Sequence, residues 1–567
     1  MHRVARLAGL CLVPALTGGV AWAQGRGGGG NWPTAGSDPQ RTAWVRTDAK
    51  ISKESLQKPG FQLLWKSKLD NQPKQLVSLT QPLLLQNIIS YKGFKALAFV
   101  GGSGDNVYSI DYDLNRPFWK THLSTGVTTA GTAACPAALT TITRSAPLAA
   151  AAGGRGRGAP PAPAPAPAAA PATPPGASPP AAAPGGARGG SPGTLPPGAG
   201  APAPAPAAQP GGGGGRGGGR GGFANANDIF AISSGGMVHV LNVQTGEDLN
   251  PPIKFLAAGA KPVGSALIGT TLYAATTDNC GGAANGVYAL DLSGETKGVT
   301  SWDSKGAAIA GSVAPAFGSD GTIYVTTGAG SGDYANALVA LDPAGLTAKG
   351  WFTGAAPFVS APVVFQANGK DMIAAASKDG RLYVLDSAAL GGADHKTPLA
   401  MAPFAAGADD TTGALATWQD ADGTRWIAVP SGAAPGAAAK IPAANGAVTT
   451  GAIVAFKVTG TDKPVLEAGW MSRDLPSPTP PLIMNGVVFA VAGGGPPAAQ
   501  LTPAQRAERA KPAVLYALDA ATGKELWNSG SAITAPVFGV GPSGGDGQVY
   551  VVAHDGTVYA FGMPVER

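Results

Sequence analysis

One short segment recurs eight times along this chain, and the recurrence limits the possible folds more than any other feature. Each copy has an aromatic or aliphatic residue, a small residue or valine, then Leu, Ile or Phe, and usually Asp or Asn. The copies lie at 108–111, 239–242, 288–291, 338–342, 383–386, 454–457, 516–519 and 559–562. Repetition at roughly 45–55 residues, with several strands in each repeat, is typical of a β-propeller. The sequence therefore predicts an all-β propeller of four-stranded antiparallel blades.

The copy at 516–527 shows how one repeat is built. Its strand ends at Asp519, whose short side chain can bond the backbone of a tight turn, and Thr522 and Gly523 complete that turn. A second strand then ends at Trp527. A large ring with one N–H suits packing between neighbouring blades. We expect this role for the tryptophans that fall near the ends of outer strands: Trp65, Trp119, Trp302, Trp351, Trp470 and Trp527.

The two ends of the chain indicate how the ring closes. The last copy of the repeat is followed by no strand that ends in Trp, because the chain stops at Arg567. Residues 61–66 have the pattern of such a strand but follow no blade of their own. The N-terminal strand is therefore expected to complete the last blade of an eight-bladed ring. Seven blades are the alternative, since the second and sixth copies are degenerate.

The first 60 residues divide into a leader and an extended segment. Arg3 and Arg6 precede an apolar run and an Ala21-Trp22-Ala23 cleavage site, so residues 1–23 are expected to form a signal peptide and 24–60 an N-terminal extended segment. Lipidation at Cys11 is disfavoured because the apolar run before it is short. No later apolar stretch is long enough to span a membrane. The protein is expected to be exported, to the periplasm or beyond.

The propeller is predicted over 61–567, with an interruption at 146–222 that consists almost wholly of Ala, Pro and Gly. Such a segment buries too little apolar surface to offset its ordering entropy, so it is expected to be a disordered linker. The linker also holds five arginines. Without these, the two leader arginines and Arg26, the net charge of +6 falls to about −2, which gives no electrostatic case for binding nucleic acid or anionic membranes.

Several long connections are predicted to lie on one face of the ring. Each joins the second strand of a blade to the third, and a plausible short helix over 502–509 has Pro at its first turn. Because loops that share a rigid scaffold commonly carry function, we expect a binding site on this face. The connections are 277–286, 328–336, 432–448 and 493–512.

The run from Ala517 to Trp527 resembles the tryptophan-docking repeat of the pyrroloquinoline quinone (PQQ) propeller superfamily, and residues 31–34 with 37–42 resemble its opening segment. The resemblance covers the mature chain apart from its insertions. It implies one of two functions. Some members are PQQ- and calcium-dependent alcohol or sugar dehydrogenases, whereas others are non-catalytic scaffolds, such as the propeller lipoprotein of the outer-membrane barrel-assembly machinery. The fold does not decide between them.

An enzyme of this superfamily is expected to have carboxylates near the channel mouth, as calcium ligand and general base, and often a pair of adjacent cysteines. This chain has no Cys-Cys pair, and no cofactor-binding residue can be carried over. The weak catalytic candidates are Asp409, Asp410 and Asp474, each just before an inner strand. The five histidines show no metal-ligand spacing, so no metal site is expected.

After removal of the leader, only Cys135 and Cys280 remain, and both should lie on the loop-bearing face of neighbouring blades. In an oxidising compartment this favours a disulfide. Two hypotheses stay open for the whole protein. The first is a non-catalytic envelope protein that uses its loop face to bind another protein or envelope component, with no cofactor. The second is a PQQ- and calcium-dependent dehydrogenase with a divergent site.

Overall fold

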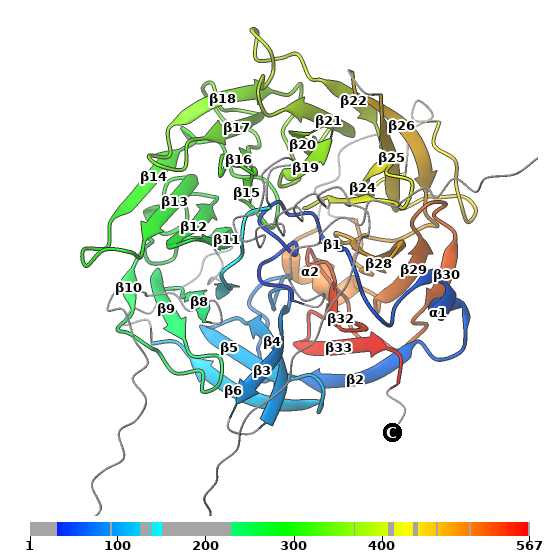
Figure 1. Cartoon of the computed structure of the whole chain (residues 1–567), viewed down its shortest axis with the longest axis horizontal. Helices are drawn as coiled ribbons and strands as arrows, with labels where there is room; N and C mark the ends of the chain where they lie inside the picture. The colour runs from blue at the N-terminus through cyan, green and yellow to red at the C-terminus, as the bar shows by residue number, and fades with distance from the viewer. Residues whose placement is uncertain are drawn as a thin grey trace, which may run out of the picture. The chain divides into compact units, whose positions relative to one another are not determined.

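Alternation of large and small residues along each repeat produces strands that bury both faces, and each copy of the repeat becomes the third strand of an antiparallel sheet. The computed structural model describes residues 31–90, 93–124, 135, 139–149, 228–367, 369–405, 413–434, 440–460, 463–497 and 501–564. Eight four-stranded blades stand around a common axis (Figure 1). The prediction of an eight-bladed all-β propeller is confirmed.

The first four blades use strands in chain order from the axis outward. Blade 1 contains β3 (Leu83–Ser90), β4 (Gly93–Gly101), β5 (Asn106–Asp111) and β6 (Arg116–His122). Blade 2 contains β7 (Thr141–Thr143), β8 (Ile229–Ile232), β9 (Met237–Leu241) and β10 (Ile253–Lys254). Blade 3 contains β11 (Pro262–Ile268), β12 (Thr271–Thr276), β13 (Gly286–Asp291) and β14 (Val299–Asp303). Blade 4 contains β15 (Ala316–Phe317), β16 (Ile323–Thr326), β17 (Ala337–Leu341) and β18 (Ala348–Thr353).

The remaining blades follow the same order. Blade 5 contains β19 (Val363–Ala367), β20 (Lys370–Ala376), β21 (Arg381–Asp386) and β22 (Ala400–Pro403). Blade 6 contains β23 (Ala416–Gln419), β24 (Arg425–Ser431), β25 (Ala452–Thr459) and β26 (Val465–Met471). Blade 7 contains β27 (Leu482–Met484), β28 (Val487–Ala492), β29 (Val514–Asp519) and β30 (Glu525–Asn528). Blade 8 contains β31 (Ser543–Gly545), β32 (Gln548–Val552) and β33 (Thr557–Gly562).

The outer strand of blade 8 comes from the N-terminal part of the chain. β2 (Gln62–Lys68) pairs antiparallel with β33, with Leu63 opposite Phe561 and Lys66 opposite Tyr559. This confirms that the N-terminal strand closes the ring. A closed ring leaves no blade without a neighbour on either side, so every apolar blade face is covered.

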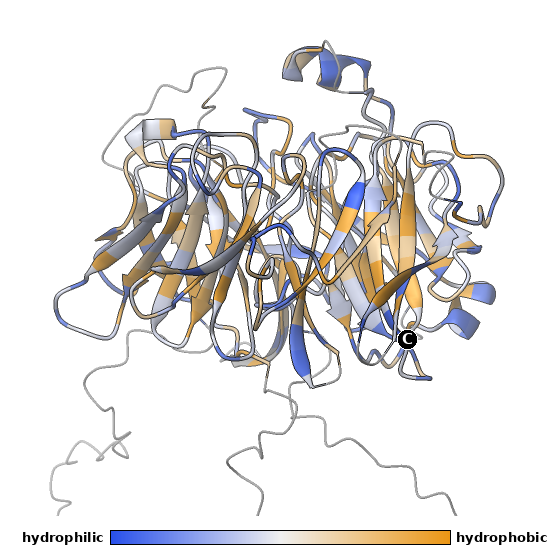
Figure 2. Cartoon of the chain, turned by 90° about the horizontal axis from the view of Figure 1, so that it is seen from above, coloured by the Kyte–Doolittle hydropathy of each residue, from blue (hydrophilic) through white to orange (hydrophobic). Residues whose placement is uncertain are grey.

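The ring has two faces that differ in their loops. Crossovers between blades and connections between second and third strands lie on one, here called the crossover face. Turns between first and second and between third and fourth strands lie on the other, the hairpin face. Figure 2 shows apolar strands between more hydrophilic loops on both sides, with the two short helices on opposite sides. They are α1 (Lys53–Gln57) and α2 (Pro503–Arg509). α2 confirms the helix predicted over 502–509.

Strands β7 and β8 flank the predicted linker as expected, but nearly all of 146–222, like the predicted leader 1–23, lies outside the described residues. Residues 146–149 are described and belong to the folded body. Ala146 is buried, and its N–H donates to the carbonyl of Leu267 in blade 3. Among described residues the longest helix has seven residues, and no helix is long and apolar enough to cross a membrane.

The centre of the ring is occupied by residues 31–46, here called the axial segment, which is dark blue in Figure 1. Trp32 exchanges both backbone hydrogen bonds with Leu84 of blade 1. β1 (Trp44–Val45) pairs parallel with β27 of blade 7. Between these points the segment binds the inner strands of blades 2 to 6. Blade 3 is bound by the Thr34 hydroxyl, and the others are bound by backbone groups of Pro33, Pro39, Gln40 and Thr42. The sequence predicted only an extended segment here.

Arg41 fixes the axial segment inside the channel. Its guanidinium is buried and donates to the carbonyl oxygens of Pro315, Ala35 and Ser265 and to the hydroxyl of Thr34. Burial lowers the pKa of Arg41 to about 10, and the nearby Asp38 opposes that shift. The side chain therefore stays charged at neutral pH, with carbonyl dipoles replacing its water.

Candidate functional site

The carboxylates predicted from the sequence divide into two groups. Asp409 and Asp410 lie outside the described residues. Asp474 is described, and its oxygens accept hydrogen bonds from the backbone N–H groups of Thr449, Thr450 and Gly451. Partial burial acts to raise the pKa of Asp474, but these N–H donors outweigh it and lower the pKa. In this structure Asp474 orders the loop before β25 rather than facing an open site.

The turn from Asp519 to Gly523 is stabilised by its own side chains. Asp519 accepts from the backbone N–H groups of Ala521 and Thr522 and from the Thr522 hydroxyl, and Gly523 has φ +70°. The ring on this turn is Trp470 of the preceding blade, whose Nε1 donates to the carbonyl of Ala520 over 2.9 Å. Trp527 in turn lies edge-on to Phe61, with ring centroids 4.8 Å apart.

The same arrangement recurs between blades 1 and 2. Trp119 donates from Nε1 to the carbonyl of Val243 over 2.9 Å and packs on Gly246, which has φ +74°. In both places a tryptophan from one blade closes against a glycine turn of the next. These tryptophans therefore pack between blades and are not available to stack on a ligand.

A disulfide joins Cys135 to Cys280 across 145 residues of sequence. Cys135 precedes the inner strand of blade 2, and Cys280 lies in the long connection between β12 and β13 of blade 3. The bond therefore ties together two connections on the crossover face.

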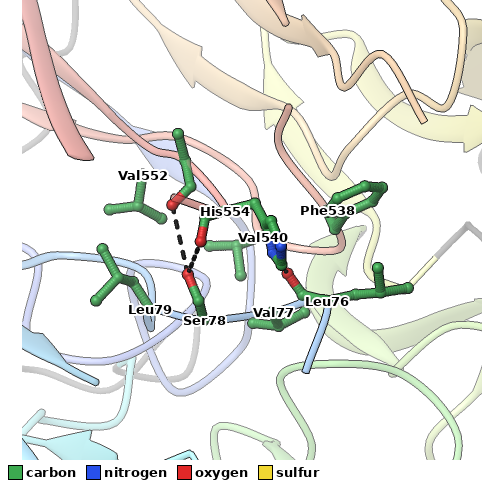
Figure 3. A pocket seen from close by; sticks show the side chains of 9 residues that line it. Leu76, Val77, Ser78, Leu79, Phe538, Val540, Val552 and His554 are labelled. Carbon is green, nitrogen blue, oxygen red and sulfur yellow. Dashed lines mark hydrogen bonds between the residues drawn. The ribbon is translucent and has the colours of Figure 1, made fainter. Parts of the chain in front are cut away.

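A small pocket opens on the crossover face where blades 7, 8 and 1 meet (Figure 3). Its empty volume is about 170 Å³, including space open to solvent. Leu76, Val77 and Leu79 come from the crossover into blade 1, whereas Phe538 and Val540 come from the crossover into blade 8. The lining is mainly apolar, with Ser78 and His554 as its polar side chains.

Hydrogen bonds fix the orientation of both polar side chains. The Ser78 hydroxyl donates to the carbonyl of His554 over 2.7 Å, and His554 Nδ1 lies 2.9 Å from the carbonyl of Leu76 (Figure 3). A carbonyl only accepts, so Nδ1 carries a proton. In the neutral ring Nε2 is then an acceptor, and in the charged ring it is a donor. The imidazole lies edge-on to Phe538, with ring centroids 5.5 Å apart.

Helix α2 adds a cation to this pocket. Thr502 caps its N-terminus in a capping box with Gln505, and Pro503 occupies the first turn. The Arg506 guanidinium lies over the Phe538 ring, 5.9 Å from the centroid, and its Nε is buried without a hydrogen-bond acceptor among the described residues. Arg509, one turn further, is exposed. An arginine with an unused donor beside an apolar wall is suited to a carboxylate.

The pocket and its surroundings do not fit the cofactor that the enzyme hypothesis requires. Calcium takes six to eight oxygen ligands. Within the described ranges, no group of three His, Cys, Asp or Glu side chains could hold a metal ion. Small-molecule sites usually measure about 300–1,000 Å³, which exceeds this pocket. Residues 31–46 lie in the axial channel and bind its inner strands.

Sequence reasoning did not select His554 or Arg506. His554 directly follows the second strand of blade 8, and that position alone places it on the crossover face. Arg506 lies in the connection 493–512, which the sequence predicts to lie on the same face. Their convergence on Phe538 depends on how three blades meet, which the repeat pattern does not contain.

Eight four-stranded blades around one axis, with tryptophans docked on glycine turns of the next blade, define the class of protein: the chain is an eight-bladed β-propeller. Residues 467–563 match the family model described as outer membrane protein assembly factor BamB. That match covers the last two blades and the end of the sixth. No curated protein matches the sequence.

Two solved structures resemble the whole ring. The quinohemoprotein alcohol dehydrogenase from Comamonas testosteroni is 14% identical, with 94% of this chain and 82% of that chain covered and a TM-score of 0.51. The quinohemoprotein alcohol dehydrogenase ADHIIG from Pseudomonas putida HK5 is 12% identical, with 95% and 82% covered and a TM-score of 0.52. At such identities the likeness shows the fold, so the comparisons leave the choice between dehydrogenase and scaffold open.

Proposed function

We propose that this chain is a non-catalytic propeller of the cell envelope that binds another protein through its crossover face. The observation that carries the proposal is the filled channel: residues 31–46 bind the inner strands of blades 1 to 7 and place Arg41 in the interior. A propeller whose axis is filled by its own chain keeps its loops as the binding surface. The family model matched by the last two blades, that of an assembly factor, supports the same class of function.

The chemistry of the crossover face indicates what such a partner presents. Arg506 offers an unused N–H next to the apolar wall formed by Phe538, Leu76 and Val540. A segment with a carboxylate beside an aliphatic or aromatic side chain would use both features. The predicted leader supports a location outside the cytoplasm, so the partner is sought among exported or outer-membrane proteins.

The test is site-specific photocrosslinking in cells of the native host. The test position is Arg509, which lies on the crossover face and is replaced by a photoreactive amino acid. The control position is Leu114, which is 56% exposed in a hairpin-face turn. We expect one discrete adduct from position 509 and none from position 114. Arg506→Glu should remove the adduct by reversing the charge, whereas Lys511→Glu, on the exposed stem beside the helix, should leave it unchanged. Equal adducts from both faces would contradict the proposal.

The alternative function is that of a PQQ-dependent dehydrogenase, favoured by the similarity of the whole ring to two quinohemoprotein alcohol dehydrogenases. It is tested by titrating the purified mature protein with PQQ in the presence of Ca²⁺, followed by dye-linked oxidation of alcohols and sugars. We expect no saturable binding at tens of micromolar. Stoichiometric binding with dye reduction would establish the enzyme and make Asp409, Asp410 and Asp474 the first residues to replace.

A further inference from the structure

Two arginines meet at the hairpin-face end of the axial channel, on the side opposite the pocket. Arg46 follows β1 in the axial segment, and Arg425 begins β24 of blade 6. Both lie near the ring of Trp44: the guanidinium carbon of Arg46 is 4.8 Å from the ring centroid and that of Arg425 is 5.7 Å from it. The two guanidinium carbons are therefore no more than about 10.5 Å apart.

Neither arginine has a carboxylate partner among the described residues. Arg425 uses one N–H, from Nη2 to the carbonyl of Gln366 over 3.2 Å, while its Nε is buried without an acceptor. Arg46 is exposed and makes no hydrogen bond within the described ranges. Other arginines of this chain do have such partners: Arg381 lies 3.4 Å from Asp379, and Arg473 lies 2.6 Å from Glu525.

Asp38, whose carboxyl group interacts electrostatically with Arg46, already accepts hydrogen bonds from another residue. Asp38 is buried and accepts from both the backbone N–H and the hydroxyl of Thr42. Burial raises the pKa of Asp38, and Arg46 and Arg41 act against that shift. Burial, together with the charge of Arg46, lowers the pKa of Arg425 to about 10. The two guanidinium groups thus lie near each other, and among the described residues neither forms an ion pair with a carboxylate.

We propose that Arg46 and Arg425 form a binding site for a phosphate group at the hairpin-face mouth of the channel. A guanidinium presents a planar fork of donors that matches phosphate oxygens bidentately, and two of them match the charge of a phosphate monoester or of inorganic phosphate near neutral pH. The Arg46 side chain is accessible to solvent. The Arg425 guanidinium is held in place by the Phe365 ring and the Gln366 carbonyl. The bound phosphate is either free phosphate from solution or the phosphate of a lipid head group.

Titration calorimetry of the full mature chain with inorganic phosphate at low ionic strength tests the site. We expect one phosphate per chain, and Arg46→Gln or Arg425→Gln should weaken binding at least about tenfold, which is about 1.4 kcal/mol. Arg425→Lys keeps the charge but loses the fork, so binding should fall between wild type and Arg425→Gln. The control is Arg381→Gln. Arg381 lies on the crossover face and has a carboxylate partner, so this variant should bind phosphate like wild type.

A second measurement separates binding from folding. Phosphate should raise the melting temperature of the wild-type protein and not that of Arg46→Gln, whose exposed side chain can change without disturbing the core. Flotation with phosphatidylcholine vesicles, with and without phosphatidic acid, identifies the source: binding only to the latter indicates a lipid phosphate, and none indicates free phosphate. No heat and no melting shift at 10 mM phosphate, or equal binding by Arg46→Gln, would overturn the proposal.

Discussion

At the scale of single residues, contacts between blades depend on glycines that leave no room for a side chain. Gly523 has φ +70°, and a Cβ added there would lie 2.4 Å from Cε3 of Trp470. Gly523→Ala therefore combines backbone strain with displacement of a docked indole. We expect it to lower the free energy of unfolding by about 2–4 kcal/mol, measured by urea denaturation with tryptophan fluorescence.

Gly530 provides the matched control for this substitution. It also has positive φ, +53°, but nothing lies within 4 Å of an added Cβ. Gly530→Ala should cost only the backbone strain, about 1 kcal/mol. Equal losses at the two positions would mean that the contact with Trp470 contributes nothing, and the docking explanation of the repeat would be wrong.

The pH dependence of stability tests whether the Asp474 carboxylate has a structural role. Its folded-state pKa is lowered, so the stability it provides is present above the unfolded value of about 4 and is lost as pH falls through the folded pKa. Asp474→Ala should cost about 1 kcal/mol at pH 7, because three backbone N–H groups lose their acceptor. The difference from wild type should shrink toward pH 3 in melting curves. A constant difference across this range would contradict the role of the charge.

At the scale of elements, Arg41 shows how strongly the axial segment is held. Arg41→Ala would leave the carbonyls of Pro315, Ala35 and Ser265 without this donor inside the ring. We expect a loss of about 3–5 kcal/mol in the free energy of unfolding. Arg41→Lys keeps the charge but only part of the hydrogen bonding, so its loss should be smaller. Losses below 1 kcal/mol for both variants would show that the segment is held by its backbone alone.

Elements that the repeat pattern encodes could be predicted from the sequence, and elements held by unrelated segments could not. The Asp519–Gly523 turn, the closing strand and the loops between second and third strands follow local rules of patterning and turn chemistry. The axial segment has no such periodicity. Its structure depends on backbone hydrogen bonds to six blades and side-chain hydrogen bonds to blade 3, and the proximity of Arg46 to Arg425 joins residues 379 positions apart. No local signal specifies such contacts.

At the scale of the whole molecule, the ring and the segment inside it stabilise each other. β2 closes blade 8 from outside, while residues 31–46 bind blades 1 to 7 from inside. One stretch of about 40 residues thus contacts every blade. A propeller whose blades each contact only their neighbours would open wherever one interface is weakest. The axial segment opposes such opening, because separating any two blades also breaks bonds to it.

Truncation tests this coupling directly. A mature chain that begins at residue 31 keeps the axial segment, whereas one that begins at residue 47 loses it but keeps β2. The shorter chain loses the buried Trp32 and Arg41 and at least six backbone hydrogen bonds to inner strands. We expect its melting temperature to fall by roughly 5–10 °C relative to the longer chain, and its core amides to exchange faster. Identical melting curves and exchange would show that the ring does not need its central segment for stability.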